Sequence, residues 1–171
     1  GSTVTVGQSI SSDDIAAGAL TFTPQANDNG VGYDTFAYTV NDGVADSLAS
    51  ATMTIDVTAV NDLPTSSDNT VTATEDTAFV FATANFGFAD VETDQLQSIT
   101  VTTLASRGTL ALNGSTVTLG QSISSDDIAA GTLTFTPLAN ANGTGYDSFQ
   151  FTVNDGVADS LASATMTIDV T

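Results

Sequence analysis

The sequence has almost no positive charge. Its 171 residues include one basic side chain, Arg107, no histidine and 20 acidic residues, so the formal net charge is −19. Nucleic-acid binding relies on Lys and Arg contacts with phosphates, and anionic lipid surfaces attract basic segments. The composition therefore excludes a nucleic-acid-binding surface and argues against docking on a membrane.

Cysteine and tryptophan are also absent. Without disulfides, a secreted module must be stabilised by its core, by metal or by neighbouring repeats. Without Cys, His or Lys, only carboxylates remain for nucleophilic or acid–base catalysis. A glycosidase needs two of them across a sugar cleft, and nothing in the sequence indicates one. We therefore expect that the protein is not an enzyme. No apolar run approaches the ~20 residues that span a membrane, so we expect no membrane insertion.

The dominant feature of the sequence is an internal repeat. Residues 3–58 and 116–171 align at an offset of 113 residues and differ at only eight of the 56 aligned positions. A period of this length is too long for a solenoid unit and fits one autonomous β-sandwich per repeat. We predict that residues 61–171 form a complete repeat and that residues 1–60 are the C-terminal half of a preceding one. The half repeat should expose its core face, with a neighbouring copy or the second repeat as candidate partners.

Alternating apolar residues between turn signals predict an all-β, Ig-like Greek-key sandwich. Expected strands of the complete repeat are 70–73, 78–84, 95–104, 108–112, 115–119, 132–136, 146–153 and 161–170. Expected strands of the half repeat are 2–6, 19–23, 33–40 and 48–57.

Two local patterns have a structural and a functional interpretation. Residues 124–131 predict a short helical turn in which Asp126 and Asp127 belong to the cap, although paired aspartates also suit acid–base chemistry. Tyr146 precedes a late strand like the tyrosine corner of Ig-like sandwiches, and its twin is Tyr33; stacking on a sugar is the alternative.

Acidic and amide side chains cluster at one expected end of the sandwich. Loops alternate between the two ends of such a fold, which should bring the incoming linker, residues 90–94 and residues 154–156 together. Calcium prefers six to eight oxygen ligands, whereas nitrogen- and sulfur-seeking metals find no His or Cys here. The candidate ligands at this end are Asn61, Asp62, Asp90, Glu92, Asp94 and Asp155.

A second group belongs to the opposite end, where Glu75 and Asp76 precede an expected strand near the loop 140–143 and Asp147. The matching loop of the half repeat, 27–30, should face the complete repeat across the linker, so that calcium would bridge the two. At both ends the alternative is that Asp and Asn only form turns. An EF-hand is rejected, because Gln95 and Val101 stand where that loop requires Gly and Glu.

Several segments together resemble the cadherin-like tandem repeats of giant RTX-type and biofilm adhesins of bacteria. They are Val60-Asn61-Asp62-Leu63-Pro64, Thr74-Glu75-Asp76-Thr77, Phe86-Gly87-Phe88 followed by Asp90, Gly108-Thr109-Leu110, Leu133-Thr134-Phe135-Thr136-Pro137, Asn142-Gly143-Thr144-Gly145-Tyr146 and Val153-Asn154-Asp155-Gly156. The resemblance implies secretion through a type I exporter, display at the bacterial cell surface, and calcium held between repeats by Asn61, Asp62, Glu75, Asp90 and Glu92.

The leading functional hypothesis is a calcium-binding extender repeat, stiffened at its junctions, that holds a distant adhesive tip away from the cell. Its partners would then be neighbouring repeats. One alternative is a polysaccharide- or cell-binding module that uses Tyr38, or Phe86 and Phe88, to stack on sugars; the expectation for Phe86 and Phe88 is the core. The other is a fibre subunit whose half repeat is completed by strands of a neighbouring chain.

Overall fold

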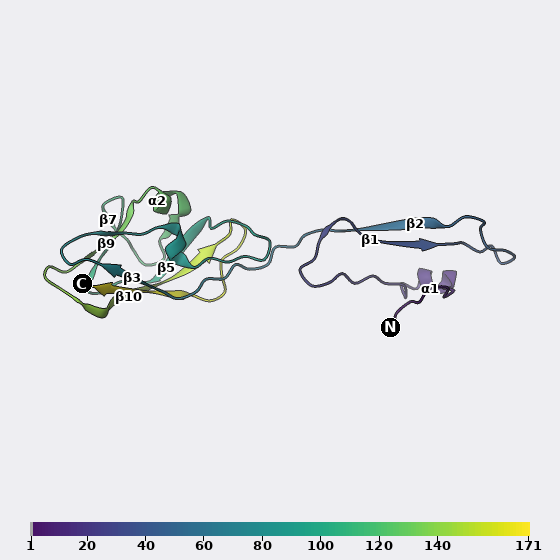
Figure 1. The fold of residues 1–171 in the computed structure, drawn as a ribbon, viewed down its shortest axis with the longest axis horizontal. Coiled ribbons are helices and arrows are strands. Elements are labelled where there is room, and N and C mark those ends of the chain that lie inside the picture. Colours follow the sequence, from purple (N-terminus) through teal and green to yellow (C-terminus); the bar gives the residue numbers. More distant parts are fainter. Residues whose placement is uncertain (1) are drawn as a thin grey trace. The chain divides into compact units, whose positions relative to one another are not determined.

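The computed structural model describes residues 2–171, which form two compact units (Figure 1). Unit 1 ends at Val60, and unit 2 is Asn61–Thr171. Most regular structure in both units is β, as expected. None of the helices among residues 2–171 has the length and apolar character needed to cross a membrane.

Unit 2 is a sandwich of two sheets. The larger sheet has the order β3-β11-β10-β5-β8, formed by β3 (Asn69–Ala73), β11 (Ala164–Val170), β10 (Gly143–Asn154), β5 (Ser98–Thr103) and β8 (Ser122–Ser124). The smaller sheet has the order β4-β9-β6-β7, formed by β4 (Phe79–Val80), β9 (Leu133–Pro137), β6 (Gly108–Leu112) and β7 (Ser115–Thr116). The strand pairs are antiparallel, except that β11 and β3 run parallel. The predicted all-β, Ig-like sandwich is confirmed.

A cluster of phenylalanines fills the space between the sheets. The fully buried members are Phe81, Phe86, Phe135, Phe149 and Phe151. The rings of Phe81 and Phe149 meet edge to face at 5.6 Å, and those of Phe86 and Phe151 at 5.0 Å. Such pairs add about 0.5–1.5 kcal/mol each to the gain from burial. Phe86 is therefore a core residue, as expected, and Phe88 is half-buried against the same core.

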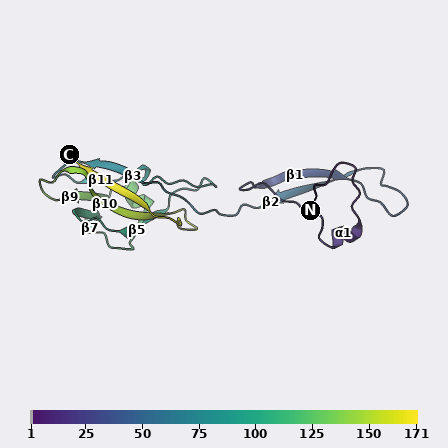
Figure 2. The same ribbon diagram turned by 90° about the horizontal axis from the view of Figure 1, so that it is seen from below.

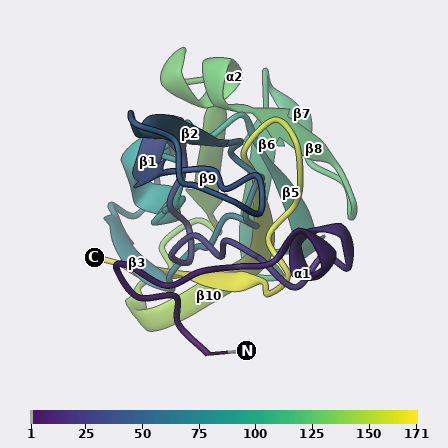
Figure 3. The ribbon, with the colours of Figure 1, turned by 90° about the vertical axis from the view of Figure 1, so that its right-hand side faces the viewer.

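A short helix and a 3₁₀ turn complete unit 2. Helix α2 (Ser125–Ala129) begins where the Ser124 hydroxyl accepts a hydrogen bond from Asp127 N, and Ser124 Oγ also donates to Asp127 Oδ2. The capping interpretation is thus confirmed for Asp127. The 3₁₀ helix η1 (Thr83–Phe86) follows β4 and ends at Gly87, which has a positive φ of 55°. Figure 3 shows α2 at the margin of unit 2, on the side away from β3 and β10.

Several strand boundaries differ from the sequence prediction. The expected strand 78–84 is reduced to β4, because the chain turns into η1 at Thr83. The expected strand 115–119 is reduced to β7, and the predicted strands of 95–104 and 161–170 begin three residues later. Strand β8 was not predicted, because Ile123 is the only apolar residue of its three and a single residue shows no alternation.

Unit 1 contains much less regular structure than residues 116–171 of unit 2, its twin in sequence. It has helix α1 (Ser12–Ala16) and one hairpin sheet of β1 (Gly30–Tyr38) and β2 (Ala51–Val57), which lie side by side in both Figure 1 and Figure 2. The strands expected at 2–6 and 19–23 do not form. Their twins in unit 2 include β7 and β9, which pair with β6 and β4, and unit 1 has no counterpart of either partner.

The core positions of unit 2 are exposed in unit 1. Phe149 and Met166 are 0% exposed, whereas the corresponding Phe36 and Met53 are 45% and 44% exposed. Among residues 2–60, none reaches the buried state. The expectation that the half repeat exposes its core face therefore holds in this structure.

The matched phenylalanines give a direct stability test. Phe149→Ala should lower the free energy of unfolding of unit 2 by about 3–5 kcal/mol, because it empties a site between two sheets. Phe36→Ala should change the same quantity by less than about 0.5 kcal/mol, because Phe36 lies outside unit 2 and its side chain is half exposed. Urea unfolding of the intact chain measures both, and equal losses for the two variants would contradict the packing described.

Candidate metal centre

Three segments of unit 2 meet at one end of its sandwich. Thr65 and Ala89 exchange backbone hydrogen bonds of 2.8 and 2.9 Å, which hold the incoming chain against the segment after η1. Gln97 N donates to Asn154 O at 2.8 Å, which joins the segment before β5 to the loop after β10. We call this end the acidic pole and define it by Asn61, Asp62, Asp90, Glu92, Asp94 and Asp155.

Asp155 is the buried carboxylate of the acidic pole. Its Oδ1 accepts hydrogen bonds from Val157 N at 2.7 Å and Ala158 N at 2.6 Å, and its Oδ2 accepts from Asn61 Nδ2 at 3.0 Å. The Ala158 bond is the main cause that lowers the pKa of Asp155; Asn61 and Val157 add to it, and partial burial opposes it. Asp155 therefore remains ionised in the folded protein at neutral pH.

The turn around Asp155 is a local structure, because unit 1 repeats it. Asp42 Oδ1 accepts hydrogen bonds from Val44 N at 2.8 Å and Ala45 N at 3.0 Å, and these bonds lower the pKa of Asp42, with the Ala45 bond the larger. Unit 2 differs in that the aspartate of the turn, Asp155, also contacts Asn61. Asn61 Nδ2 also donates to Asp62 O at 2.6 Å, so its amide joins the linker to the β10–β11 loop.

The loop 90–94 supplies the second part of the acidic pole. Asp94 N donates to Asp90 Oδ1 at 3.0 Å, and Asp62 N donates to Glu92 Oε2 at 3.1 Å. Asp90 Oδ2 is buried and has no hydrogen-bond partner in the structure. A buried carboxylate oxygen without a donor costs free energy, and a cation would supply the missing interaction. The donor set of this end, carboxylates with an amide and backbone carbonyls, fits calcium.

The acidic pole is less concentrated than the sequence suggested. Within residues 2–171, no group of three or more Asp or Glu side chains lies in an arrangement that could hold a metal ion. The contacts join Asn61 to Asp155 and to the carbonyl of Asp62, Asp62 N to Glu92, and Asp94 N to Asp90, so that no three carboxylates converge. A cation at this end would therefore need amide and backbone oxygens in addition to carboxylates. The assignment of these residues as metal ligands stays a prediction.

Glu75 and Asp76 lie at the other end of β3. Glu75 N donates to Thr171 O at 2.8 Å, and Asp76 Oδ1 accepts from Asn140 N at 2.9 Å. Asp76 and Asn140 both have φ of 57°, a left-handed conformation that Asp and Asn adopt more readily than most residues. These contacts give Asp76 a role in joining two turns, and the Glu75 side chain is exposed.

Sequence reasoning missed the anchoring role of buried Asp147, which accepts hydrogen bonds from Ser106 N, Arg107 N and Ser148 N. Next to it, the Tyr146 hydroxyl donates to Arg107 O and accepts from Leu138 N, and Arg107 Cζ lies 4.8 Å from the Tyr146 ring centre. As in a tyrosine corner, the Tyr146 hydroxyl bonds to upstream backbone, but Tyr146 lies within β10 rather than before it, and its acceptor is in the loop before β6. Because the ring is buried, sugar stacking there is excluded. In the sequence, the adjacent Tyr146-Asp147 pair was the available signal for the anchoring role of Asp147.

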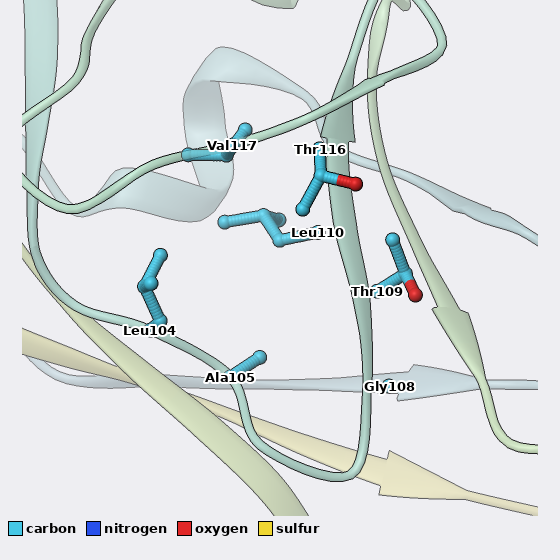
Figure 4. A pocket seen from close by; sticks show the side chains of 7 residues that line it. All are labelled: Leu104, Ala105, Gly108, Thr109, Leu110, Thr116 and Val117. Carbon is cyan, nitrogen blue, oxygen red and sulfur yellow. The ribbon is translucent and has the colours of Figure 1, made fainter.

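A small cavity lies beside β6. It has a volume of about 80 Å³, and its lining residues are Leu104, Ala105, Gly108, Thr109, Leu110, Thr116 and Val117. Figure 4 shows Leu104, Leu110 and Val117 turned toward the same space. Ligand pockets usually measure about 300–1,000 Å³. This cavity is too small for a sugar chain and carries no carboxylate.

The sequence of unit 2 matches a known protein family. The model of a family described as "Bacterial Ig domain" matches residues 61–171, which are the residues of unit 2. No curated protein matches the chain.

The hydrogen bonds to Asp155 predict a pH dependence. Because its pKa is lowered in the folded state, the stabilisation is present above the ordinary value of 3.8 and is lost as pH falls through the folded-state value. Asp155→Asn should therefore make the fall in melting temperature between about pH 5 and pH 3 shallower than in the wild type. Thermal melts across this range measure it, with the exposed Asp126→Asn as control. An unchanged slope in the Asp155 variant would contradict the assignment.

Proposed function

The chain belongs to the bacterial Ig domain family through residues 61–171, and from this we propose that it is a calcium-binding extender repeat of a secreted bacterial surface adhesin. The domain is a packed sandwich whose described cavity is small and apolar, which suits a structural role better than a catalytic one. A repeated domain that adds length without a ligand pocket is what an extender needs.

The observation that carries the calcium proposal is the buried, unpartnered Asp90 Oδ2. In a native structure such an atom calls for an explanation, and an ion is one of the few available. Asp90, Glu92 and Asp155, with the side-chain oxygen of Asn61 and the carbonyl of Asp62, are the groups that would hold it. A bound divalent cation would supply positive charge, which the chain, at −19, has from only one basic side chain.

The acidic pole also gives calcium a mechanical effect. Its hydrogen bonds already join the linker residues Asn61 and Asp62 to the loops that carry Asp155 and Glu92. A cation shared by these groups would resist separation of the linker from the sandwich. The stiffening would begin at the first residues of unit 2.

The polysaccharide-binding alternative receives less support. Phe86 lies in the core, and Phe88 packs against it. Tyr38, 37% exposed, occupies the position of the buried core residue Phe151 in the twin. The proposed stacking groups therefore belong to the packing of the repeat.

Calcium binding is tested by thermal unfolding of the intact chain with calcium or with a chelator. Saturation to a hundred times Kd should stabilise unit 2 by about 2.7 kcal/mol, which corresponds to a rise in melting temperature of several degrees. Asp90→Asn should abolish most of this rise, because it removes the unpartnered carboxylate oxygen. Asp126→Asn, at an exposed helix position, should retain it.

Two results would count against the proposal. The first is a melting temperature that does not respond to millimolar calcium. The second is an equal response in the wild type and in Asp90→Asn, which would place any bound ion elsewhere. Isothermal titration of the same three proteins gives the stoichiometry independently of stability.

A further inference from the structure

One residue next to the proposed ligands has a backbone conformation that is unfavourable for its side chain. Thr93 has a φ of 68°, in the left-handed region. Among residues 2–171, the other residues besides glycine with a positive φ are all Asn or Asp, namely Asn27, Asp76, Asn113 and Asn140. Asn and Asp tolerate this region, whereas a β-branched residue is strained in it. The Thr93 side chain is exposed, so packing does not offset the strain.

Hydrogen bonds of both neighbours hold Thr93 in this conformation. Asp94 N donates to Asp90 Oδ1 at 3.0 Å, which draws the two ends of the loop 90–94 together. Glu92 Oε2 accepts from Asp62 N at 3.1 Å, which ties the middle of the loop to the linker. A residue persists in a sparsely populated backbone conformation where its surroundings impose it, and such positions cluster at ligand clamps and switches. The closed form of the loop therefore contains strain at Thr93.

Few buried groups keep this loop closed. Its flanks are anchored by the backbone pair of Thr65 and Ala89 and by the bond from Gln97 N to Asn154 O. Between these anchors, each of the residues 90–96 is exposed or half-buried. Segments with few buried contacts open locally at a lower free energy than the core beside them. The strain at Thr93 lowers that free energy further, because opening relieves it.

We propose that residues 90–96 form a latch that opens while the sandwich stays folded, and that the strain at Thr93 sets how often it opens. Opening breaks the bonds from Asp94 N to Asp90 and from Asp62 N to Glu92, so it releases Asp62 of the linker from the sandwich. The bond of Asn61 to Asp155 lies outside the latch and keeps the linker attached. The opening needs no calcium and thus lies beyond the proposed function.

The latch also affects access to Asp90 Oδ2. This atom is buried and has no hydrogen-bond partner in the structure. A cation from solvent can reach it only when the atoms around it move, and opening of the latch supplies such a movement. Entry of calcium by this route rests on the proposed function, whereas the opening itself does not.

Hydrogen exchange of the intact chain, with calcium removed by a chelator, tests the latch. The readout is the protection factor of the Asp62 and Asp94 amides, which corrects for the effect of a substitution on the intrinsic exchange rate. In the wild type, both amides should exchange at least about a hundredfold faster than the hydrogen-bonded amides of β10. Thr93→Asn should raise both protection factors about five- to thirtyfold, because Asn adopts the left-handed region with less strain.

Thr93→Val is the matched control for the backbone. It keeps the β-branched side chain, and with it the strain, but removes the hydroxyl. The protection factors of Asp62 and Asp94 should stay within about twofold of the wild type. A rise in Thr93→Asn without a rise in Thr93→Val assigns the effect to the backbone conformation.

Ile168→Val is the control for the sandwich, because Ile168 is fully buried in β11 and away from the latch in sequence. Loss of one buried methylene should lower the protection of the β10 amides about two- to tenfold. It should leave the protection of the Asp62 and Asp94 amides unchanged, because the latch opens without unfolding of the sandwich.

Three outcomes would overturn the proposal. The first is wild-type protection of Asp62 and Asp94 equal to that of β10, which would mean that the latch opens only when unit 2 unfolds. The second is equal protection of these amides in the wild type and in Thr93→Asn, which would mean that Thr93 is not strained. The third is a rise in Thr93→Val as large as in Thr93→Asn. Because calcium is absent throughout, failure of the calcium proposal would not change any of these results.

Discussion

The fold of unit 2 depends on the burial of the apolar face of its β10–β11 hairpin. The β-hairpin of β10 and β11 is stable in a sandwich because residues 61–113 lie across it and bury Phe149, Phe151 and Met166. Nearly the same sequence in unit 1 lacks that cover and leaves the matching side chains exposed. Isolated two-stranded hairpins are marginal in water, whereas a second layer supplies the burial that stabilises a domain. The unit that folds as a sandwich is therefore the full repeat, and its two halves are complementary surfaces.

Within the sandwich, backbone N–H groups rather than basic side chains stabilise the negative charge of the carboxylates. With one arginine for 20 carboxylates, salt bridges cannot balance the acidic residues. Asp147, Asp155 and Asp76 accept backbone hydrogen bonds instead, and each of them thereby fixes a turn. Asp90 is different, because one of its oxygens is buried without a donor. Of the two ends at which the sequence predicted calcium, this difference favours the acidic pole over the end that carries Glu75 and Asp76.

The sequence was most informative where a structure depends on local pattern. The alternation of apolar residues predicted the strand 108–112 with its observed bounds. Ser124, as an N-cap, predicted helix α2, which begins at the next residue. It failed where a strand exists only through its partner: residues 19–23 alternate as well as 133–137 do, yet only the latter have β4 and β6 to pair with. The acidic pole was placed by fold-level reasoning about loops. The pairwise arrangement of its side chains and the anchoring by Asp147 depend on distances that no pattern encodes.

Amide hydrogen exchange on the intact chain tests the central claim most directly, because it compares the twin hairpins within one molecule. If burial under residues 61–113 stabilises the hairpin, amides of β10 and β11 should exchange at least about a thousandfold more slowly than those of β1 and β2. Equal protection of the two hairpins would contradict the account, since it would mean that the hairpin is stable without its cover.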